Sequence, residues 1–299
     1  MANEPETTGI PRRKTRRLLL WVLGITVVLI LFVNLLEMDF DLLGDDRVAL
    51  VRVEGVILDA QQTVSELKKF GDAPSVKAIV LRIDSPGGGV VPSQEIHDAI
   101  KQVRAKNNKA IIASMGSVAA SGGYYIAAAT DRILANPGTL TGSIGVIMEL
   151  ANLEGLLKKI GVESVVVKAG RHKDVGSPFR QMSEEERRLL QAVMDDVHQQ
   201  FIEAVAEGRS LQIADVTLLA DGRLFTGRQA KEFKLVDELG DLDDAIKLAA
   251  DLGGIEGEPK VIEPHRRFSL RDLLESRLLG GLPRFDWPGS VGLKYLVAF

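Results

Sequence analysis

From Arg47 onward, short runs of β-branched and aliphatic residues alternate with longer amphipathic stretches. An apolar run of strand length, bounded by turn-forming residues, favours a buried β-strand, and apolar residues at three- and four-residue spacing favour a helix. Strands that alternate with helices are typical of an α/β domain. The predicted strands lie at 47–57, 76–83, 110–115, 132–137 and 162–168.

The clearest helix signal begins at Ser183. Ser183 and Glu186 form a capping-box pattern, in which each side chain accepts a hydrogen bond from the other residue's backbone N–H. Apolar residues then recur at four-residue intervals up to Gly208, which predicts a helix with one buried face: Leu189, Val193, Val197, Phe201 and Val205. Further helices are predicted at 92–103, 227–234 and 241–251.

A different hydrophobic pattern precedes the domain. Residues 18–36 carry no charge, and at about 1.5 Å per helical residue they span about 28 Å, close to the hydrocarbon thickness of a bilayer. The basic cluster at 12–17 predicts that residues 1–17 stay in the cytoplasm and that the following domain faces outward. We therefore expect a single-pass protein of the inner (cytoplasmic) membrane.

A cleavable signal peptide is the alternative interpretation of this segment. The apolar run at 18–36 is longer than a typical signal-peptide core, and no small-residue cleavage site follows it. The sequence favours an anchor. The domains expected from these patterns are an α/β unit at 47–262 and a tail at 263–299.

Composition narrows the possible functions. The 299 residues, 45% hydrophobic and 26% charged, are ordinary for a folded protein, and the net charge of −4 gives no reason to expect a nucleic-acid partner. Cysteine is absent, which excludes disulfides, thiolate catalysis and cysteine-ligated metals. Any nucleophile would be oxygen or nitrogen, and we expect neither a cofactor nor a metal.

Three glycines, 87–89, follow the predicted strand at 76–83 and directly precede a predicted helix. Backbone N–H groups at such a turn can face an anion. The turn lacks the Lys-Ser/Thr of a P-loop and the glycine spacing of a dinucleotide fold, so it suits an oxyanion hole better.

Ser121 is the second candidate for chemistry. It follows the predicted strand at 110–115 and precedes Gly122 and Gly123 at the start of a short helical stretch. A serine in this place is ordinarily a helix N-cap. The glycines would also let a substrate approach closely, and the helix dipole would stabilise developing negative charge. The local pattern leaves both roles open.

Three motifs, in this order and spacing, resemble the signal peptide peptidases of the SppA family. They are LRIDSPGGGV at 81–90, SVAASGGYYIA at 117–127 and LTGSIGV at 140–146. The resemblance covers about residues 47–250 and is to the short bacterial form, which has one catalytic unit. It implies the crotonase/Clp-protease fold, a spiral of β-β-α units, preceded by one transmembrane helix.

The resemblance also implies a Ser-Lys dyad. The nucleophile matches Ser121 and the lysine matches Lys173, while Gly88 and Gly122 match the oxyanion-hole donors and the Ser143 hydroxyl matches the group that orients the lysine. A lysine serves as a general base only when it is neutral, which near pH 7 requires burial that lowers its pKa.

A Ser-His-Asp arrangement is the alternative, because protease relatives of this fold use one. His172 is the main competitor of Lys173, but neighbours in an extended segment point to opposite sides, so only one of them could face Ser121. The remaining histidines fit packing or surface positions better: His97, His198 and His265.

The expected function is that of a membrane-anchored serine endopeptidase that degrades hydrophobic peptides, such as cleaved signal-peptide remnants. Short family members form rings in which serine and lysine come from neighbouring subunits, and the single copy of each motif fits a homo-oligomeric ring, with an octamer as one candidate. Two alternatives stay open: a crotonase-fold acyl-CoA hydrolase or hydratase, and a catalytically silent membrane-anchored scaffold.

The tail at 263–299 departs from the pattern of a compact domain, because glycine and proline interrupt it before an apolar end. It could lie on the membrane, on a neighbouring subunit or in the substrate groove, or it could be a flexible terminus with some hydrophobic docking. The sequence does not choose among these.

Overall fold

The computed structural model describes residues 45–264 and 294–296, together with residues 21, 23–25 and 28. The chain divides into two units, residues 1–44 and 45–299. In the first unit the five described residues are helical and exposed, and the rest of the expected anchor at 18–36 lies outside the described residues. No helix within the described ranges is both long enough and apolar enough to cross a bilayer.

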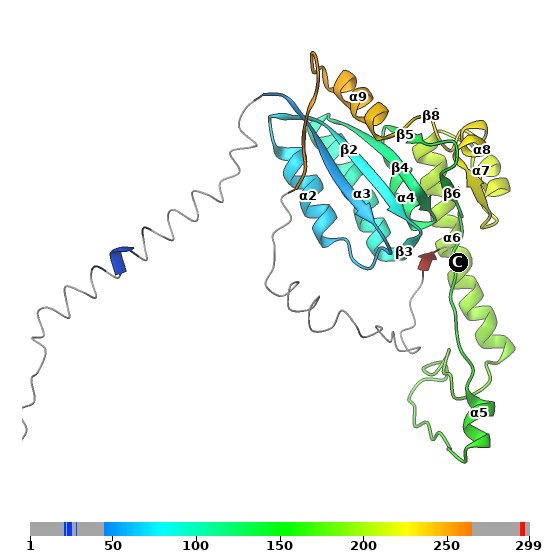
Figure 1. Cartoon of the computed structure of the whole chain (residues 1–299). Coiled ribbons are helices and arrows are strands. Elements are labelled where there is room, and N and C mark those ends of the chain that lie inside the picture. Colours follow the sequence, from blue (N-terminus) through cyan, green and yellow to red (C-terminus); the bar gives the residue numbers. More distant parts are fainter. Residues whose placement is uncertain (1–20, 22, 26–27, 29–44, 265–293, 297–299) are drawn as a thin grey trace, which may run out of the picture. The chain divides into compact units, whose positions relative to one another are not determined.

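An eight-stranded mixed sheet forms the centre of the second unit (Figure 1). Its longest strands are parallel neighbours, with β2 between β1 and β4. Both faces of these strands are buried, which explains their nearly continuous apolar sequence. The strands are β1 (Arg47–Glu54), β2 (Val76–Ser85), β4 (Ala110–Ala120), β5 (Arg132–Ala135), β6 (Leu140–Gly142), β7 (Leu224–Thr226), β8 (Glu238–Leu239) and β9 (Lys260–Ile262).

Helices cover both faces of this sheet. On one face, Ala245 and Ala249 of α9 pack against Leu50 and Val80. Strand residues alternate between faces, so their neighbours, such as Ile79, point to the opposite face, where α2, α3 and α4 contact the strands. The helices are α2 (Gln61–Asp72), α3 (Val90–Asn107), α4 (Gly122–Ala127), α5 (Glu154–Lys159), α6 (Glu184–Arg209), α7 (Ile213–Leu219), α8 (Gly227–Glu232) and α9 (Leu242–Gly253).

The α/β class and the helices expected from the sequence are confirmed. Ser183 caps α6, and the full capping box with Glu186 is present. The helices expected at 227–234 and 241–251 correspond to α8 and α9, and each of these also begins with a capping box. The capping-box pattern therefore located the start of α6 correctly.

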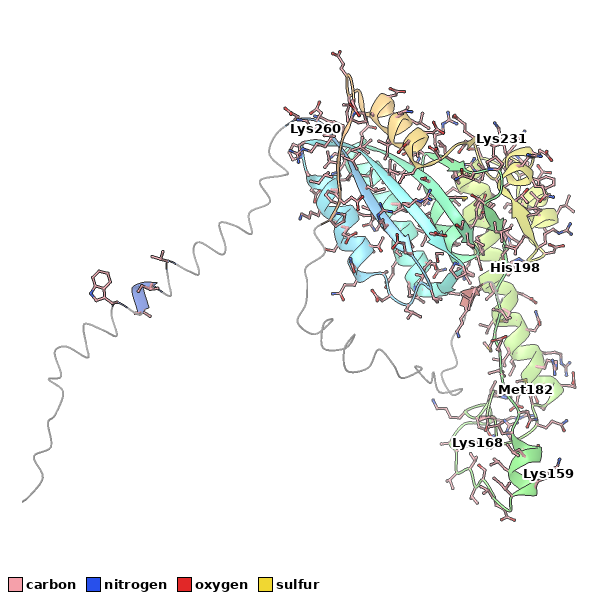
Figure 2. All side chains as sticks on the ribbon, viewed as in Figure 1. Lys159, Lys168, Met182, His198, Lys231 and Lys260 are labelled. Atoms are coloured by element: carbon pink, nitrogen blue, oxygen red, sulfur yellow. The ribbon has the colours of Figure 1, made fainter. Side chains whose placement is uncertain are left out.

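A projecting arm consists of residues 148–182 and the first turns of α6 (Figure 1). Figure 2 shows Lys159, Lys168 and Met182 on this arm, with His198 further along α6 towards the sheet. The strand expected at 162–168 is wrong, because these residues are exposed and form no strand in the described structure. A β-branched run becomes a strand only beside a partner edge, and the arm offers none.

Candidate active site

Ser121 lies between β4 and α4 in a strained backbone conformation, with φ 53° and ψ −118°. Backbone hydrogen bonds of the Ser121 N–H and of the Ser121 carbonyl stabilise this conformation. The Ser121 N–H donates to the Gly142 carbonyl at 2.8 Å, and the Ser121 carbonyl accepts from the Tyr125 N–H at 2.8 Å. Strain that the surroundings maintain is a frequent feature of active sites.

The Ser121 side chain does not cap the helix that it precedes. Its residue is 1% exposed, and Oγ has no hydrogen-bond partner among the described residues. A buried hydroxyl left without a partner costs about 1–3 kcal/mol, so native structures seldom keep one without a role. Of the two roles that the sequence left open, the structure excludes the N-cap.

The glycine turn after β2 packs directly against the start of α4. A Cβ on Gly87 would lie 2.7 Å from the Gly122 nitrogen, and a Cβ on Gly122 would lie 3.2 Å from the Gly88 nitrogen. Only glycine permits this approach of two backbones. Because β2 and β4 are parallel neighbours, their carboxyl ends bring Gly88 and Gly122 together beside Ser121.

One edge of the short strand β3 (Gly87–Gly89) is hydrogen-bonded to the backbone of Ile57. The Ile57 N–H donates to the Gly87 carbonyl at 2.9 Å, and the Gly89 N–H donates to the Ile57 carbonyl at 2.8 Å. Successive residues of a strand direct their N–H groups to opposite sides. The Gly88 N–H therefore points away from Ile57, on the side where a peptide could lie.

Ser143 follows β6 with φ 49° and is nearly buried. Its N–H donates to the Arg223 carbonyl at 2.8 Å. Ser143 lines a cavity of about 550 Å³, together with Met194 and His198 of α6 and Leu296 of the tail. The cavity is large enough to admit a side chain from outside.

Lys173 lies in the arm and is exposed. It makes no hydrogen bond to Ser121 Oγ, which has no partner among the described residues. Residues 171–176 form successive turns, so the assumption of an extended segment at His172 and Lys173 was wrong. His172 Nε2 instead lies 3.8 Å from Glu185 Oε1. Within a single chain, Ser121 thus lies beside Gly88 and Gly122, whereas Lys173 and His172 lie in the arm.

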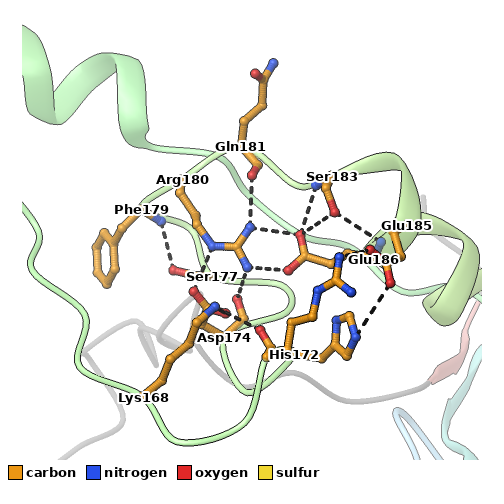
Figure 3. A network of polar contacts seen from close by, with 11 residues as sticks. Lys168, His172, Asp174, Ser177, Phe179, Arg180, Gln181, Ser183, Glu185 and Glu186 are labelled. Atoms are coloured by element: carbon orange, nitrogen blue, oxygen red, sulfur yellow. Dashed lines mark hydrogen bonds and ion pairs between the residues drawn. The ribbon is translucent and has the colours of Figure 1, made fainter.

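A polar network anchors the loop that carries Lys173 (Figure 3). Arg180 donates from Nε to Asp174 Oδ2 at 2.8 Å and from a terminal nitrogen to Glu186 Oε2 at 2.8 Å. Hydrogen bonding to Arg180 lowers the pKa of Glu186 to about 2, and it also lowers the pKa of Asp174, which Lys168 contacts as well. The loop is therefore tied to the start of α6.

The other histidines separate into different environments. His97 is buried on α3 with its ring 4.8 Å from that of Tyr125, and burial lowers its pKa. The packing role expected for His97 is confirmed. His198 borders the Ser143 cavity, and its buried Nε2 has no hydrogen-bond partner within the described residues. His265 lies outside the described residues.

The tail contributes strand β10 (Lys294–Leu296), which pairs antiparallel with β3. Tyr295 faces Gly88 in this pairing, and its side chain is fully buried. The sequence left the position of the tail open, and the structure places its strand β10 beside β3. The apolar end of the tail was the available signal, and such a pattern does not identify its partner surface.

Two family models and several relatives match this chain. A model of peptidase family S49 matches residues 103–256, and a Clp protease model matches residues 42–138. A Synechocystis protein provisionally named protease slr0021 is 46% identical over 211 residues, which cover 70% of this chain and 76% of that protein. The Clp match and the mixed sheet confirm a Clp-protease-like α/β fold.

Two further relatives carry more specific names. An Enterococcus faecium protein provisionally named signal peptide peptidase SppA is 38% identical over 216 residues, covering 68% of this chain and 62% of that protein. Protease 4 of Salmonella typhi is 36% identical over 218 residues, covering 70% of this chain but 35% of that protein. The resemblance to the SppA family is thereby confirmed.

Proposed function

Because the chain belongs to peptidase family S49, we propose that it is a membrane-anchored serine endopeptidase in which Ser121 attacks the peptide bond. The observation that carries the proposal is the Ser121 hydroxyl, which is buried, does not cap a helix and lies beside the paired glycines 88 and 122. An acyl-CoA hydratase or a silent scaffold would have no use for such a hydroxyl.

In the proposed reaction, Ser121 Oγ attacks the carbonyl carbon of the scissile bond and its proton passes to the neutral amine of Lys173. The N–H groups of Gly88 and Gly122 stabilise the negative charge on the carbonyl oxygen, and one such donor is worth about 2.7–4 kcal/mol in the transition state. Lys173 then protonates the leaving amine. It finally takes a proton from the water that hydrolyses the acyl-enzyme.

We further propose that Lys173 reaches Ser121 from a neighbouring subunit of a homo-oligomeric ring. Three features support this proposal. Lys173 lies on a projecting arm, Ser121 Oγ has no partner in its own described chain, and Ser143 borders a cavity of about 550 Å³. The Ser143 hydroxyl would orient the incoming amine.

The proposed substrates are hydrophobic peptides such as signal-peptide remnants. The proposed location is the inner membrane, with residues 18–36 as the anchor and the catalytic unit outside the cytoplasm. The uncharged stretch at 18–36 after a basic cluster supports this orientation. An anchored peptidase would meet such peptides where they arise.

Mixing two inactive variants tests the nucleophile, the base and the shared site together. Full-length Ser121→Ala and Lys173→Ala should each lose hydrolysis of apolar peptide esters, and mixed oligomers should regain part of it, because some sites combine an intact serine with an intact lysine. Lys159→Ala, at another exposed lysine of the arm, is the matched control and should stay active.

Each outcome of this experiment has a definite meaning. Full activity in either single variant would exclude the dyad. Two inactive variants that do not complement each other would place the dyad within one chain. Labelling of Ser121 by a fluorophosphonate separates a peptidase from a hydratase or a scaffold, which should not be labelled.

A further inference from the structure

Two buried serine hydroxyls border the glycine turn that would carry the oxyanion donors. Ser85 is the last residue of β2 and Ser93 lies near the start of α3, and both residues are fully buried. Neither hydroxyl takes part in the proposed reaction. Burying a hydroxyl is unfavourable unless it is hydrogen-bonded, so the partners of each serine indicate its role.

Ser85 fixes the direction of one oxyanion donor. Its Oγ accepts a hydrogen bond from the Gly87 N–H at 3.1 Å, and the Gly87 carbonyl accepts from the Ile57 N–H at 2.9 Å. Gly87 is thus held on both sides, at φ 101°, a conformation that favours glycine. The Gly87 carbonyl and the Gly88 N–H belong to one planar peptide. The two hydrogen bonds therefore set the direction of the Gly88 N–H.

Ser93 contacts the turn after β2 and also the start of α4. Its Oγ donates to the Gly89 carbonyl at 2.8 Å, and it lies 2.5 Å from the point that a Cβ on Gly122 would occupy. Serine hydroxyls in helices commonly donate to the carbonyl four residues earlier, so the first contact alone would be ordinary. The second contact is not local, because Gly122 begins a different helix. The Ser93 oxygen therefore joins the two segments that carry the donors.

The Gly89 carbonyl does not depend on Ser93 for helix formation. Gly89 is the N-cap residue of α3, and the carbonyl of an N-cap residue already accepts the first hydrogen bond within the helix. Loss of the Ser93 hydroxyl would leave this carbonyl with a donor, so the cost to folding should be small. A large fall in activity would then have to come from the position of the turn.

We propose that Ser85 and Ser93 are positioning residues that hold the N–H groups of Gly88 and Gly122 at the separation that an oxyanion requires. Ser85 directs the Gly88 N–H, and Ser93 keeps the start of α4 at its distance from the same turn. Donors stabilise an oxyanion from about 2.7–3.1 Å, so a small displacement of either N–H weakens the effect. The proposal rests on the proposed function in one respect, that Gly88 and Gly122 form the oxyanion hole.

Ser85→Ala and Ser93→Ala in the full-length chain test the proposal through the separate effects on kcat and KM. Each variant should lower kcat for an apolar peptide ester about tenfold, less than the loss of a whole donor, because the N–H is displaced and not removed. KM should stay the same, since the oxyanion exists only in the transition state. The double variant should lose more activity than either single variant, because the two hydroxyls act on different donors.

Ser114→Ala is the matched control. Ser114 is a buried serine of β4 whose Oγ accepts from an Arg82 terminal nitrogen at 2.9 Å, so this variant also loses a hydrogen bond to a serine hydroxyl. Ser114 pairs with Arg82 along the strands, before their carboxyl ends, and its loss should leave kcat unchanged. Thermal melting of the variants measures the cost to folding. Unchanged kcat in Ser85→Ala and Ser93→Ala, or an equal fall in Ser114→Ala, would overturn the proposal.

An aldehyde inhibitor gives a second measurement that depends on the oxyanion hole. Ser121 Oγ adds to the aldehyde carbon of acetyl-Leu-Leu-leucinal, its proton passes to the base, and the former carbonyl oxygen carries the charge that the two N–H groups stabilise. The alcohol acetyl-Leu-Leu-leucinol cannot form this bond. Both serine variants should weaken inhibition by the aldehyde about tenfold and leave inhibition by the alcohol unchanged. Equal weakening for both compounds would overturn the proposal, because the whole groove would then be altered.

The positioning role and the proposed function fail in different ways. If Ser121 is not the nucleophile, the aldehyde inhibits the unaltered chain no more strongly than the alcohol does, and both proposals are overturned. If only the positioning role is wrong, the unaltered chain prefers the aldehyde and the two serine variants keep the same preference.

Discussion

The backbone nitrogen of Gly88 lies 3.2 Å from the point that a Cβ atom on Gly122 would occupy. The two glycines belong to different strand-to-helix turns, and their contact brings two N–H donors to one side of Ser121. The same point lies 2.5 Å from Ser93 Oγ. Any side chain at position 122 must therefore displace the turn, the Ser93 hydroxyl or both.

Gly122→Ala should lower kcat by about 10²–10³, the effect of losing one oxyanion donor. KM should change little, because the donor acts on charge that develops in the transition state. Steady-state kinetics measures the effect, and thermal melting shows whether the variant is folded. Gly138→Ala is the control, since a Cβ there meets nothing within 4 Å. A folded Gly122→Ala variant with unchanged kcat would contradict the assignment.

Ser121→Ala should be inactive yet at least as stable as the unaltered protein. The substitution removes a buried hydroxyl that has no partner among the described residues, and relief of such a group is worth about 1–3 kcal/mol. Urea unfolding should show an equal or higher free energy of unfolding. A clear loss of stability would mean that the hydroxyl makes a structural hydrogen bond.

The network around Arg180 should make the arm sensitive to acid. Hydrogen bonds from Arg180 lower the pKa of Glu186 from 4.5 to about 2. A carboxylate with a lowered folded-state pKa contributes stability above its ordinary pKa and loses it as the pH falls through the folded-state value. The contribution of Glu186 to the stability of the arm should therefore be complete above pH 4.5 and should be lost as the pH falls towards about 2.

Arg180→Ala should remove this pH dependence and also lower kcat, because the loop that carries Lys173 is no longer tied to α6. Hydrogen exchange of residues 154–182 at pH 7 and pH 3 measures the first effect, and peptide hydrolysis measures the second. Arg171→Ala, which loses only an exposed ion pair with Glu185, is the matched control. Identical exchange in both variants would exclude the network as the anchor of the loop.

Residues 1–44 should hold the protein in the membrane. The full chain should stay in the membrane fraction after carbonate extraction, and a chain that begins at residue 45 should be released, because the uncharged stretch at 18–36 is lost. Release of the full chain by carbonate would contradict the anchor. Circular dichroism of the shorter chain checks its folding, which the separate unit at 45–299 leads us to expect.

Short-range patterns in the sequence were sufficient for several features. The α/β class, the start of α6 at its capping box and the motif around Ser121 depend on residues close together in the chain. The motifs also identified the family. These features could be predicted because a helix cap or a tight turn forms its hydrogen bonds within a few residues, and because the spacing of apolar residues indicates a strand or a helix locally.

Other features depended on partners distant in sequence, and only the tertiary structure decided them. Residues 162–168 have strand propensity but no partner edge, so they remain an exposed part of the arm. Tyr295 gains its place from the rings of Tyr125 in α4 and Phe201 in α6, which are distant from it in sequence. Backbone pairing and burial need a complementary surface, and no local pattern specifies which surface that is.

The sequence alone therefore determined the class of fold, the family and Ser121 as a candidate. The tertiary structure decided that Ser121 does not cap its helix, that Gly88 and Gly122 meet beside it, and that the tail strand faces Gly88. The physical reason is the same in each case: a hydrogen bond or a close approach between distant segments exists only once the parallel strands have brought those segments together.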